Sequence, residues 1–179
     1  GASGVSPMGF TDRFPRWLQR VYFRLVRPLL FRRYRYLLET IRREKCRRIL
    51  EIGVWNGLQA EQMIREARKF HTDVEYYGFD LFEEMTSERF AHAVAKRPPS
   101  MAVVQKDLER TGARIRLFKG DTRSTLPAAK LPQMDLIYID GDHSLDGVAA
   151  DWRNVQHVMG PQTVVIFDDY WNRTAEGAR

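Results

Sequence analysis

Five short apolar segments, each with a carboxylate in it or directly after it, limit the possible folds of this chain more than any other feature. They are residues 49–53, 77–80, 117–121, 136–140 and 164–168, with the acids Glu51, Asp80, Asp121, Asp140 and Asp168. Nearly continuous apolar segments of this length are typical of strands buried on both faces of a parallel sheet. Ligands bind at the carboxyl edge of such sheets. We therefore expect the five acids to line one crevice.

Helical periodicity occupies the stretches between these segments. The predicted strands are residues 48–53, 74–80, 114–118, 135–140 and 163–168, and the predicted helices are residues 57–70, 100–112 and 145–158. This alternation predicts an α/β fold with a doubly wound, mostly parallel sheet. A further helical insertion is expected through Phe90 and Ala95. The last helix is expected to end at Gly160-Pro161 and to bury one apolar face, formed by Leu145, Val148, Ala149, Trp152 and Val155.

The length and composition indicate one globular domain. The chain has 179 residues, of which 44% are hydrophobic, and no apolar stretch approaches the roughly 18 residues of a membrane span. The single cysteine, Cys46, has no partner for an intrachain disulfide, and the first residues do not resemble a signal peptide. A cytoplasmic location is the resulting expectation.

Positive charge is concentrated near the N-terminus and divides the chain into three expected parts. Residues 1–12 are expected to form a disordered leader, residues 13–46 a basic helical arm, and residues 47–179 the α/β domain. Thirteen Lys and Arg residues stand against two acids between Arg13 and Arg48, whereas the whole chain has a net charge of +6. The chain ends shortly after the fifth predicted strand. Either further C-terminal strands are missing, or the arm covers the sheet edge that they would protect.

The arm is predicted to contain an amphipathic helix that Pro28 interrupts, and then a second helix over residues 30–45. Four arginines are expected to face solvent from the first helix: Arg16, Arg20, Arg24 and Arg27. Three roles are open for the arm. It can pack on the domain or on a second subunit in a homodimer, lie on a membrane surface, or bind nucleic acid through the interleaved arginines and tyrosines of residues 32–36.

The turn after the first strand has a Gly-x-x-x-Gly pattern at Gly53 and Gly57. Glycines at such a turn bring the backbone close to a ligand at the N-terminus of the next helix. In the dinucleotide-binding fingerprint a further glycine makes room for a pyrophosphate, and here Trp55 stands in that place. The indole argues against NAD or FAD, whereas S-adenosylmethionine carries no phosphate and is compatible with it.

With these features, residues 48–171 resemble the class I S-adenosylmethionine-dependent methyltransferase family. The resemblance rests on the acidic, glycine-containing turn at 51–57, on Asp80, on Gly120-Asp121 and on the sequence Asp140-Gly141-Asp142-His143. It implies that the backbone of residues 53–57 lies against the methionine part of the cofactor and that Glu51 supports the loop.

The same resemblance implies that Asp80 accepts hydrogen bonds from the ribose hydroxyls and that Asp121 meets the adenine amino group. The implied cofactor contacts also include Val54, Trp55, Leu81, Thr122 and Asp140. A turn-cap role for Asp80 and a helix-cap role for Asp121 remain open, because acids are common at both positions.

The acids Asp140, Asp168 and Asp169 follow the fourth and fifth predicted strands, which we expect to be neighbours. Three oxygen ligands suit a hard cation, Mg²⁺ before Ca²⁺. The arrangement is similar to the metal-dependent O-methyltransferases, of both the catechol type and the macrolide-sugar type. Successive side chains of a strand point to opposite faces, so Asp168 and Asp169 can both bind a metal only where the strand has ended. The alternative is that one of them caps a turn.

His143 is the candidate catalytic base, because it follows Asp140 by three residues and its ordinary pKa lies near 6.5. The alternative is that it only bonds Asp142 or the start of the next helix. Four side chains of the insertion and the C-terminal tail can line an acceptor pocket, although core packing explains them equally well: Phe82, Met85, Tyr170 and Trp171.

The sequence therefore predicts an enzyme, an S-adenosylmethionine-dependent methyltransferase that uses Mg²⁺ to methylate an oxygen of a small hydroxylated acceptor such as a sugar, glycan or natural product. Two alternatives stay open. One is an RNA methyltransferase that binds through the arm, and the other is an inactive cofactor-binding scaffold whose arm contacts a membrane or a partner.

Overall fold

The computed structural model describes residues 14–84, 99–142 and 144–168. Their central element is a parallel sheet of five strands in the order β3-β2-β1-β4-β5. The strands are β1 (Arg48–Ile52), β2 (Glu75–Asp80), β3 (Arg114–Lys119), β4 (Met134–Ile139) and β5 (Met159–Phe167). The predicted doubly wound sheet is confirmed. Chain order reverses between β1 and β4, and this switch point is where such sheets bind ligands.

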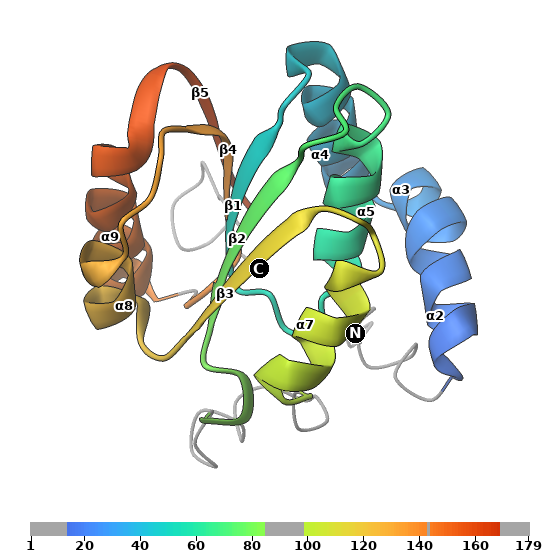
Figure 1. Ribbon diagram of the computed structural model, residues 1–179, viewed down its shortest axis with the longest axis horizontal. Helices are drawn as coiled ribbons and strands as arrows, with labels where there is room; N and C mark the ends of the chain where they lie inside the picture. The colour runs from blue at the N-terminus through green and yellow to red at the C-terminus, as the bar shows by residue number, and fades with distance from the viewer. Residues whose placement is uncertain (1–13, 85–98, 143, 169–179) are drawn as a thin grey trace, which may run out of the picture.

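Helices cover both faces of the sheet (Figure 1). On one face lie α4 (Arg32–Glu44), α5 (Leu58–Ala67) and α7 (Met101–Glu109), and on the other lie α8 (Thr122–Ala128) and α9 (Leu145–Val155). Ile49 and Tyr76 pack toward the first layer, whereas Leu50 and Tyr77 pack toward the second. The strands read as continuous apolar segments because both of their faces are buried.

Strand β5 begins at Met159, before the predicted position, and therefore contains Gly160 and Pro161. The helix that was expected to end at this pair ends earlier, with a 3₁₀ turn at Gln156–Val158. β5 lies at the edge of the described sheet, where a proline removes no necessary ladder hydrogen bond. The sheet register also shifts between Met134 and Leu136, opposite this irregular start.

The predicted apolar face of α9 is confirmed at Val155, which is buried, and wrong at Leu145 and Trp152, which are 90% and 37% exposed. The other buried residues of the helix are Gly147, Ala150 and Asp151. Leu145 is the first residue of α9, and Trp152 packs against the Phe167 ring at a centroid distance of 5.9 Å.

The arm consists of α2 (Arg16–Val21), a π-helical turn (Tyr22–Val26), α3 (Arg27–Leu30) and then α4. Pro28 lies within the first turn of α3, where proline is tolerated. The helix ends instead at Phe31, whose backbone is extended. Figure 1 shows α2 and α3 outside α5, on the side away from the sheet. No helix in the described part of the chain is long and apolar enough to cross a membrane.

The expected orientation of the first arm helix is reversed. Arg16 and Arg20 bond acids of the domain, and Arg27 is buried. Of the four arginines that were expected to face solvent, Arg24 is the one that is exposed as predicted. The predicted helix through Phe90 and Ala95, and the leader, lie outside the described residues.

Candidate functional site

The carboxyl ends of the strands are joined at one edge by backbone hydrogen bonds. Asp140 N–H donates to the Ile52 carbonyl at 2.8 Å, and Asp168 N–H donates to the Ile139 carbonyl at 3.0 Å. On the other side of β1, Gly120 N–H donates to the Asp80 carbonyl at 3.0 Å. These bonds continue the sheet by one residue past the strands, so acids that are distant in sequence lie along one edge, as predicted.

The turn after β1 requires glycine for steric reasons. Gly53 has a φ of +91°, and a Cβ on it would lie 1.9 Å from the Asp140 carbonyl oxygen. Gly57, the N-cap of α5, has a φ of +74°, and a Cβ there would lie 2.8 Å from a Val104 methyl carbon. Only glycine adopts both the backbone angle and the close approach without strain. The turn therefore lies directly against the end of β4.

Asp80 connects this turn to the end of β2. One carboxylate oxygen accepts a hydrogen bond from Trp55 N–H at 2.6 Å, and the other accepts one from Phe82 N–H at 2.9 Å. Trp55 and Phe82 have positive φ values of 52° and 49°, which are strained conformations for side chains of this size. The carboxylate therefore stabilises two unusual turns at once, and its turn-capping role is present in this structure.

Glu51 lies inside the sheet, 1% exposed, and accepts a hydrogen bond from the Tyr76 hydroxyl on β2. Burial raises the pKa of Glu51 well above its ordinary value, and the nearby charges of Asp140 and Asp80 raise the pKa further. Both effects favour the neutral form of this carboxyl beneath the turn. Its position fits the predicted support of the loop, since it anchors the end of β1 to β2.

Asp121 is the N-cap of α8, and its carboxylate accepts a hydrogen bond from Arg123 N–H at 2.9 Å. The helix-cap alternative is therefore observed. Next to it, the Thr122 hydroxyl donates to Asp151 at 2.6 Å. Asp151 is 2% exposed, and burial raises its pKa.

Sequence reasoning missed Asp151, which is not among the residues of the predicted apolar face. A Cβ on Gly141 would lie 3.2 Å from its second carboxylate oxygen. Asp151 therefore joins α9 to the ends of β3 and β4, beside Asp121 and Thr122. The small and apolar residues directly before it, Val148, Ala149 and Ala150, are the one signal that was present in the sequence.

Asp140 and Asp168 meet at the hydroxyl of Tyr138, a residue of β4. The hydroxyl lies 2.7 Å from an Asp168 carboxylate oxygen and 3.4 Å from one of Asp140. Burial raises the pKa of Tyr138, and the two carboxylates raise it further, so the phenol remains a donor. The predicted adjacency of these two acids is confirmed.

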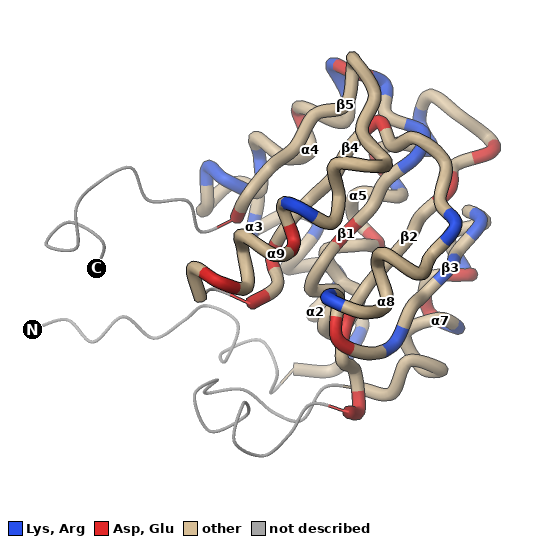
Figure 2. Tube along the Cα trace, turned by 90° about the vertical axis from the view of Figure 1, so that its left-hand side faces the viewer, with Lys and Arg blue, Asp and Glu red and all other residues tan. Residues whose placement is uncertain are grey.

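A side chain of the arm also contacts this pair. Arg33, in the first turn of α4, lies 2.9 Å from the second carboxylate oxygen of Asp168, whose side chain is only 6% exposed. Figure 2 shows basic positions near α3 and α4 beside the end of β5. Among the residues that the structure describes, Asp168 therefore pairs with a guanidinium of the arm, which was predicted to be separate from the site.

The metal prediction is tested only in part by this geometry. Among residues 14–84, 99–142 and 144–168, no group of three or more His, Cys, Asp or Glu side chains is placed to hold a metal ion. Asp140 and Asp168 offer two carboxylates, the donor type that Mg²⁺ prefers. The third predicted ligand, Asp169, and the predicted base, His143, lie outside the described residues.

Of the two alternatives for Phe82, acceptor pocket or core, the structure shows the core. This ring is fully buried in the cluster between the sheet and α5, so it belongs to the core. Met85, Tyr170 and Trp171 lie outside the described residues.

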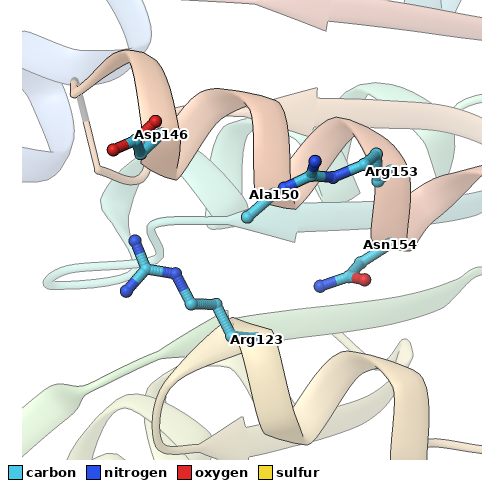
Figure 3. Close-up of a pocket in the computed structure, with 5 residues that line it drawn as sticks. All are labelled: Arg123, Asp146, Ala150, Arg153 and Asn154. Carbon is cyan, nitrogen blue, oxygen red and sulfur yellow. The ribbon is translucent and has the colours of Figure 1, made fainter.

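The described surface also has a groove of about 500 Å³ between α8 and α9 (Figure 3). Arg123, Asp146, Ala150, Arg153 and Asn154 line it. It is open to solvent and lies on the outer sides of these helices. None of the predicted site residues lines it, so it is distinct from the candidate site.

A family model described as "Methyltransferase domain" matches residues 50–170 of this chain. This match covers every residue predicted to bind the cofactor or the metal and the predicted base, His143. No curated protein sequence matches the chain.

Solved structures share the fold. The S-adenosylhomocysteine-bound methyltransferase PaMTH1 of Podospora anserina is 21% identical, with a TM-score of 0.56 over 76% of this chain and 51% of that one. The O-methyltransferase TomG of Streptomyces achromogenes, solved with S-adenosylmethionine, is 15% identical, with a TM-score of 0.59 over 89% of this chain and 69% of that one. The O-methyltransferase of Bacillus cereus in complex with S-adenosylhomocysteine is 16% identical, with a TM-score of 0.56 over 89% and 70%. The chain spans 51%, 64% and 63% of the first three structures that match it.

Proposed function

The chain belongs to the methyltransferase-domain family, and from this membership we propose that it transfers the methyl group of S-adenosylmethionine to an oxygen atom of a small hydroxylated acceptor. The observation that carries the proposal is the position of Asp80. Its carboxylate lies at the end of β2, bonded to the turn between Gly53 and Gly57. Two structures of the same fold, at low identity, carry this cofactor or its demethylated product and are O-methyltransferases by name.

In this proposal the described residues bind and orient the cofactor. The strained turn after β1 places its backbone beside the switch point, where the methionine part would lie. Asp80 would accept hydrogen bonds from the ribose hydroxyls in addition to the two N–H donors that fix its orientation, because a carboxylate has about four lone-pair sites. Asp121, Thr122 and Asp151 would border the adenine ring from the ends of β3 and α9.

The acceptor would meet the β4–β5 side of the edge. There Asp140 and Asp168 would hold Mg²⁺ together with Asp169, and His143 would take the proton of the acceptor hydroxyl. A bound Mg²⁺ would lower the pKa of that hydroxyl. The Tyr138 hydroxyl already orients both carboxylates, and Arg33 would have to leave Asp168 before the ion could bind there.

Ion pairs between arm arginines and domain carboxylates favour a small acceptor over RNA. Arg16, Arg20, Arg33 and Arg42 are bonded to carboxylates of the domain, and Arg27 is buried. Arginines that pair with protein acids are not available to neutralise phosphates. Within residues 32–36, which suggested the nucleic-acid alternative, Arg33 is paired with Asp168 and Tyr34 is buried, whereas Arg32 and Arg35 stay exposed.

Calorimetric titration with S-adenosylmethionine, with and without Mg²⁺, tests the proposal. We expect binding in both cases and formation of S-adenosylhomocysteine when hydroxylated acceptors are added. Absence of cofactor binding would overturn the proposal, and binding without turnover on any acceptor would favour the inactive scaffold. Comparison of the wild type with His143→Ala separates catalysis from binding. We expect kcat to fall about 100-fold with little change in cofactor affinity, and an unchanged kcat would remove His143 from the reaction.

A further inference from the structure

The first arm helix exposes an apolar side and directs Arg16, Arg20 and Arg27 toward the domain, which is the reverse of the usual arrangement for a surface helix. Trp17, Val21, Leu25 and Leu29 recur every four residues and are 64%, 42%, 56% and 78% exposed. Leu30 extends the row and is 64% exposed. Residues with this spacing lie on one side of a helix. We call these five residues the arm stripe.

The opposite side of the same helix is held against the domain by charge. Arg20 bonds Glu61 at 3.0 Å and Asp107 at 3.4 Å, and Arg16 bonds Asp107 at 3.2 Å. Glu61 lies on α5 and is only 3% exposed. A buried carboxylate without a partner costs free energy. Pairing Glu61 with Arg20 therefore favours the orientation in which the arginine side of the helix faces the domain.

Arg27 completes this attachment further along the helix. It is 5% exposed, donates to Gln59 at 2.8 Å, and its guanidinium lies 3.4 Å from the centre of the Tyr34 ring. Phe23, which is 5% exposed, packs on the same guanidinium at 4.3 Å. The helix therefore cannot turn its apolar side inward without breaking several buried contacts.

Basic side chains border the arm stripe. Arg24 borders the row beside Val21, and Arg32 follows Leu30 after the helix is interrupted at Phe31. Both are exposed, and neither forms an ion pair with any residue that the structure describes. An apolar row with tryptophan near one end and arginines at its border matches a surface that lies in the interface of an anionic bilayer.

We propose that the arm stripe binds the surface of an anionic membrane, with its apolar side chains among the acyl chains and Arg24 and Arg32 at the headgroups. A second copy of this chain fits less well, because a two-fold contact along the row would bring the two sets of arginines together. The proposal does not depend on the proposed function. Membrane binding through the arm stripe would place the α/β domain beside the lipid surface. The proposed cofactor site is formed by the strand ends and the turn after β1, not by the arm stripe.

Flotation of the full chain with vesicles tests the proposal. One vesicle type contains phosphatidylcholine alone, and the other contains phosphatidylcholine and phosphatidylserine. We expect binding to the second type, weakened by added salt because charge contributes. The variant Leu25→Glu/Leu29→Glu should bind at least about tenfold more weakly, since it removes two of the apolar side chains that insert.

A matched control changes exposed apolar residues elsewhere. Leu145→Glu/Val103→Glu alters side chains that are 90% and 51% exposed on α9 and α7, and it should bind vesicles like the wild type. All variants should keep the wild-type circular dichroism spectrum and thermal midpoint, because the changed positions are exposed. A second measurement compares tryptophan emission with and without vesicles in the wild type and in Trp17→Phe. The blue shift on insertion should disappear in the variant.

Three results would overturn the proposal. The first is no binding to the phosphatidylserine vesicles, and the second is equal binding by the wild type and by Leu25→Glu/Leu29→Glu. The third is a dimer by light scattering that this variant dissociates while vesicles have no effect, which would assign the arm stripe to a second copy of the chain.

Discussion

On the β1–β2 side of the carboxyl edge, Asp80 is held by two backbone N–H groups, those of Trp55 and Phe82. On the β4–β5 side, Asp168 is held by two side chains, the Tyr138 hydroxyl and the Arg33 guanidinium. Backbone donors are fixed by the turns that present them, whereas side-chain donors can rotate away. The first side is therefore preorganised, and the second can exchange its partners, which suits a place where a metal or an acceptor would bind.

The strongest test of the preorganised side is Gly53→Ala. The variant places a Cβ 1.9 Å from the Asp140 carbonyl oxygen at a φ of +91°, so we expect the free energy of unfolding to fall by about 3 kcal/mol or more in urea denaturation. Gly112→Ala is the matched control, because Gly112 also has a positive φ, 75°, but a Cβ there would lie 3.4 Å from the flexible Arg68 side chain. Equal losses in the two variants would contradict the steric argument.

Asp80→Ala tests whether the same side binds the cofactor. We expect the affinity for S-adenosylmethionine to fall about 100-fold, because two charge-assisted hydrogen bonds to ribose and the orientation of the turn are lost together. Calorimetry measures the change. Asp121→Ala, at the N-cap of α8, should lower the affinity for S-adenosylmethionine by about tenfold or less. If Asp80→Ala binds as the wild type does, the assignment of this side to the nucleoside is wrong.

Glu51→Gln tests the buried carboxyl beneath the turn through the pH dependence of stability. Burial raises the pKa of Glu51, so the folded chain keeps a proton that the unfolded chain releases above its ordinary pKa. Stability should therefore fall as pH rises from 5 to 8, by at most about 1.4 kcal/mol per pH unit from this group. The glutamine variant should flatten this fall in urea titrations.

A control for this measurement is Glu75→Gln. The pKa of Glu75 is lowered, first by the Tyr77 hydroxyl. Its stabilisation is present above the ordinary pKa and is lost only as pH falls below it. The profile of Glu75→Gln between pH 5 and 8 should therefore run parallel to that of the wild type. An identical slope in the wild type and in Glu51→Gln would show that Glu51 is charged in the folded state.

Arg33→Gln tests the exchangeable side and has the smallest expected effect. Removal of the guanidinium from Asp168 should raise the affinity for Mg²⁺ about fivefold, as expected for a partly exposed ion pair of roughly 1 kcal/mol. Calorimetric titration with Mg²⁺ measures it. Arg42→Gln removes another arm–domain pair, Arg42–Glu66 at 2.9 Å, and should leave the affinity unchanged. Equal Mg²⁺ affinity in wild type and Arg33→Gln would show that the guanidinium and the ion do not compete.

Much of the fold and of the preorganised side could be predicted from the sequence. Continuous apolar segments indicate buried parallel strands, and an acid at the end of such a strand must lie at the carboxyl edge. The conformation of Gly53 and Gly57 also follows from residue type and spacing. These predictions succeeded because each depends on backbone geometry over a few residues.

The predictions that failed depended on which surface a helix meets. Spacing alone placed Arg16, Arg20 and Arg27 in solvent, but buried carboxylates such as Glu61 attract them to the domain. Spacing likewise placed Leu145 in the core, although it lies at the exposed start of α9.

The sequence by itself determined the parallel sheet, the order of its acids along one edge and the glycine turn, because local periodicity and steric limits at single residues decide them. Only the tertiary structure decided that Arg33 pairs with Asp168, 135 residues away, that Asp151 supports the ends of β3 and β4, and that the arm stripe faces outward. Those contacts depend on the free energy of burying charges from separate elements together, and a linear pattern does not contain that information.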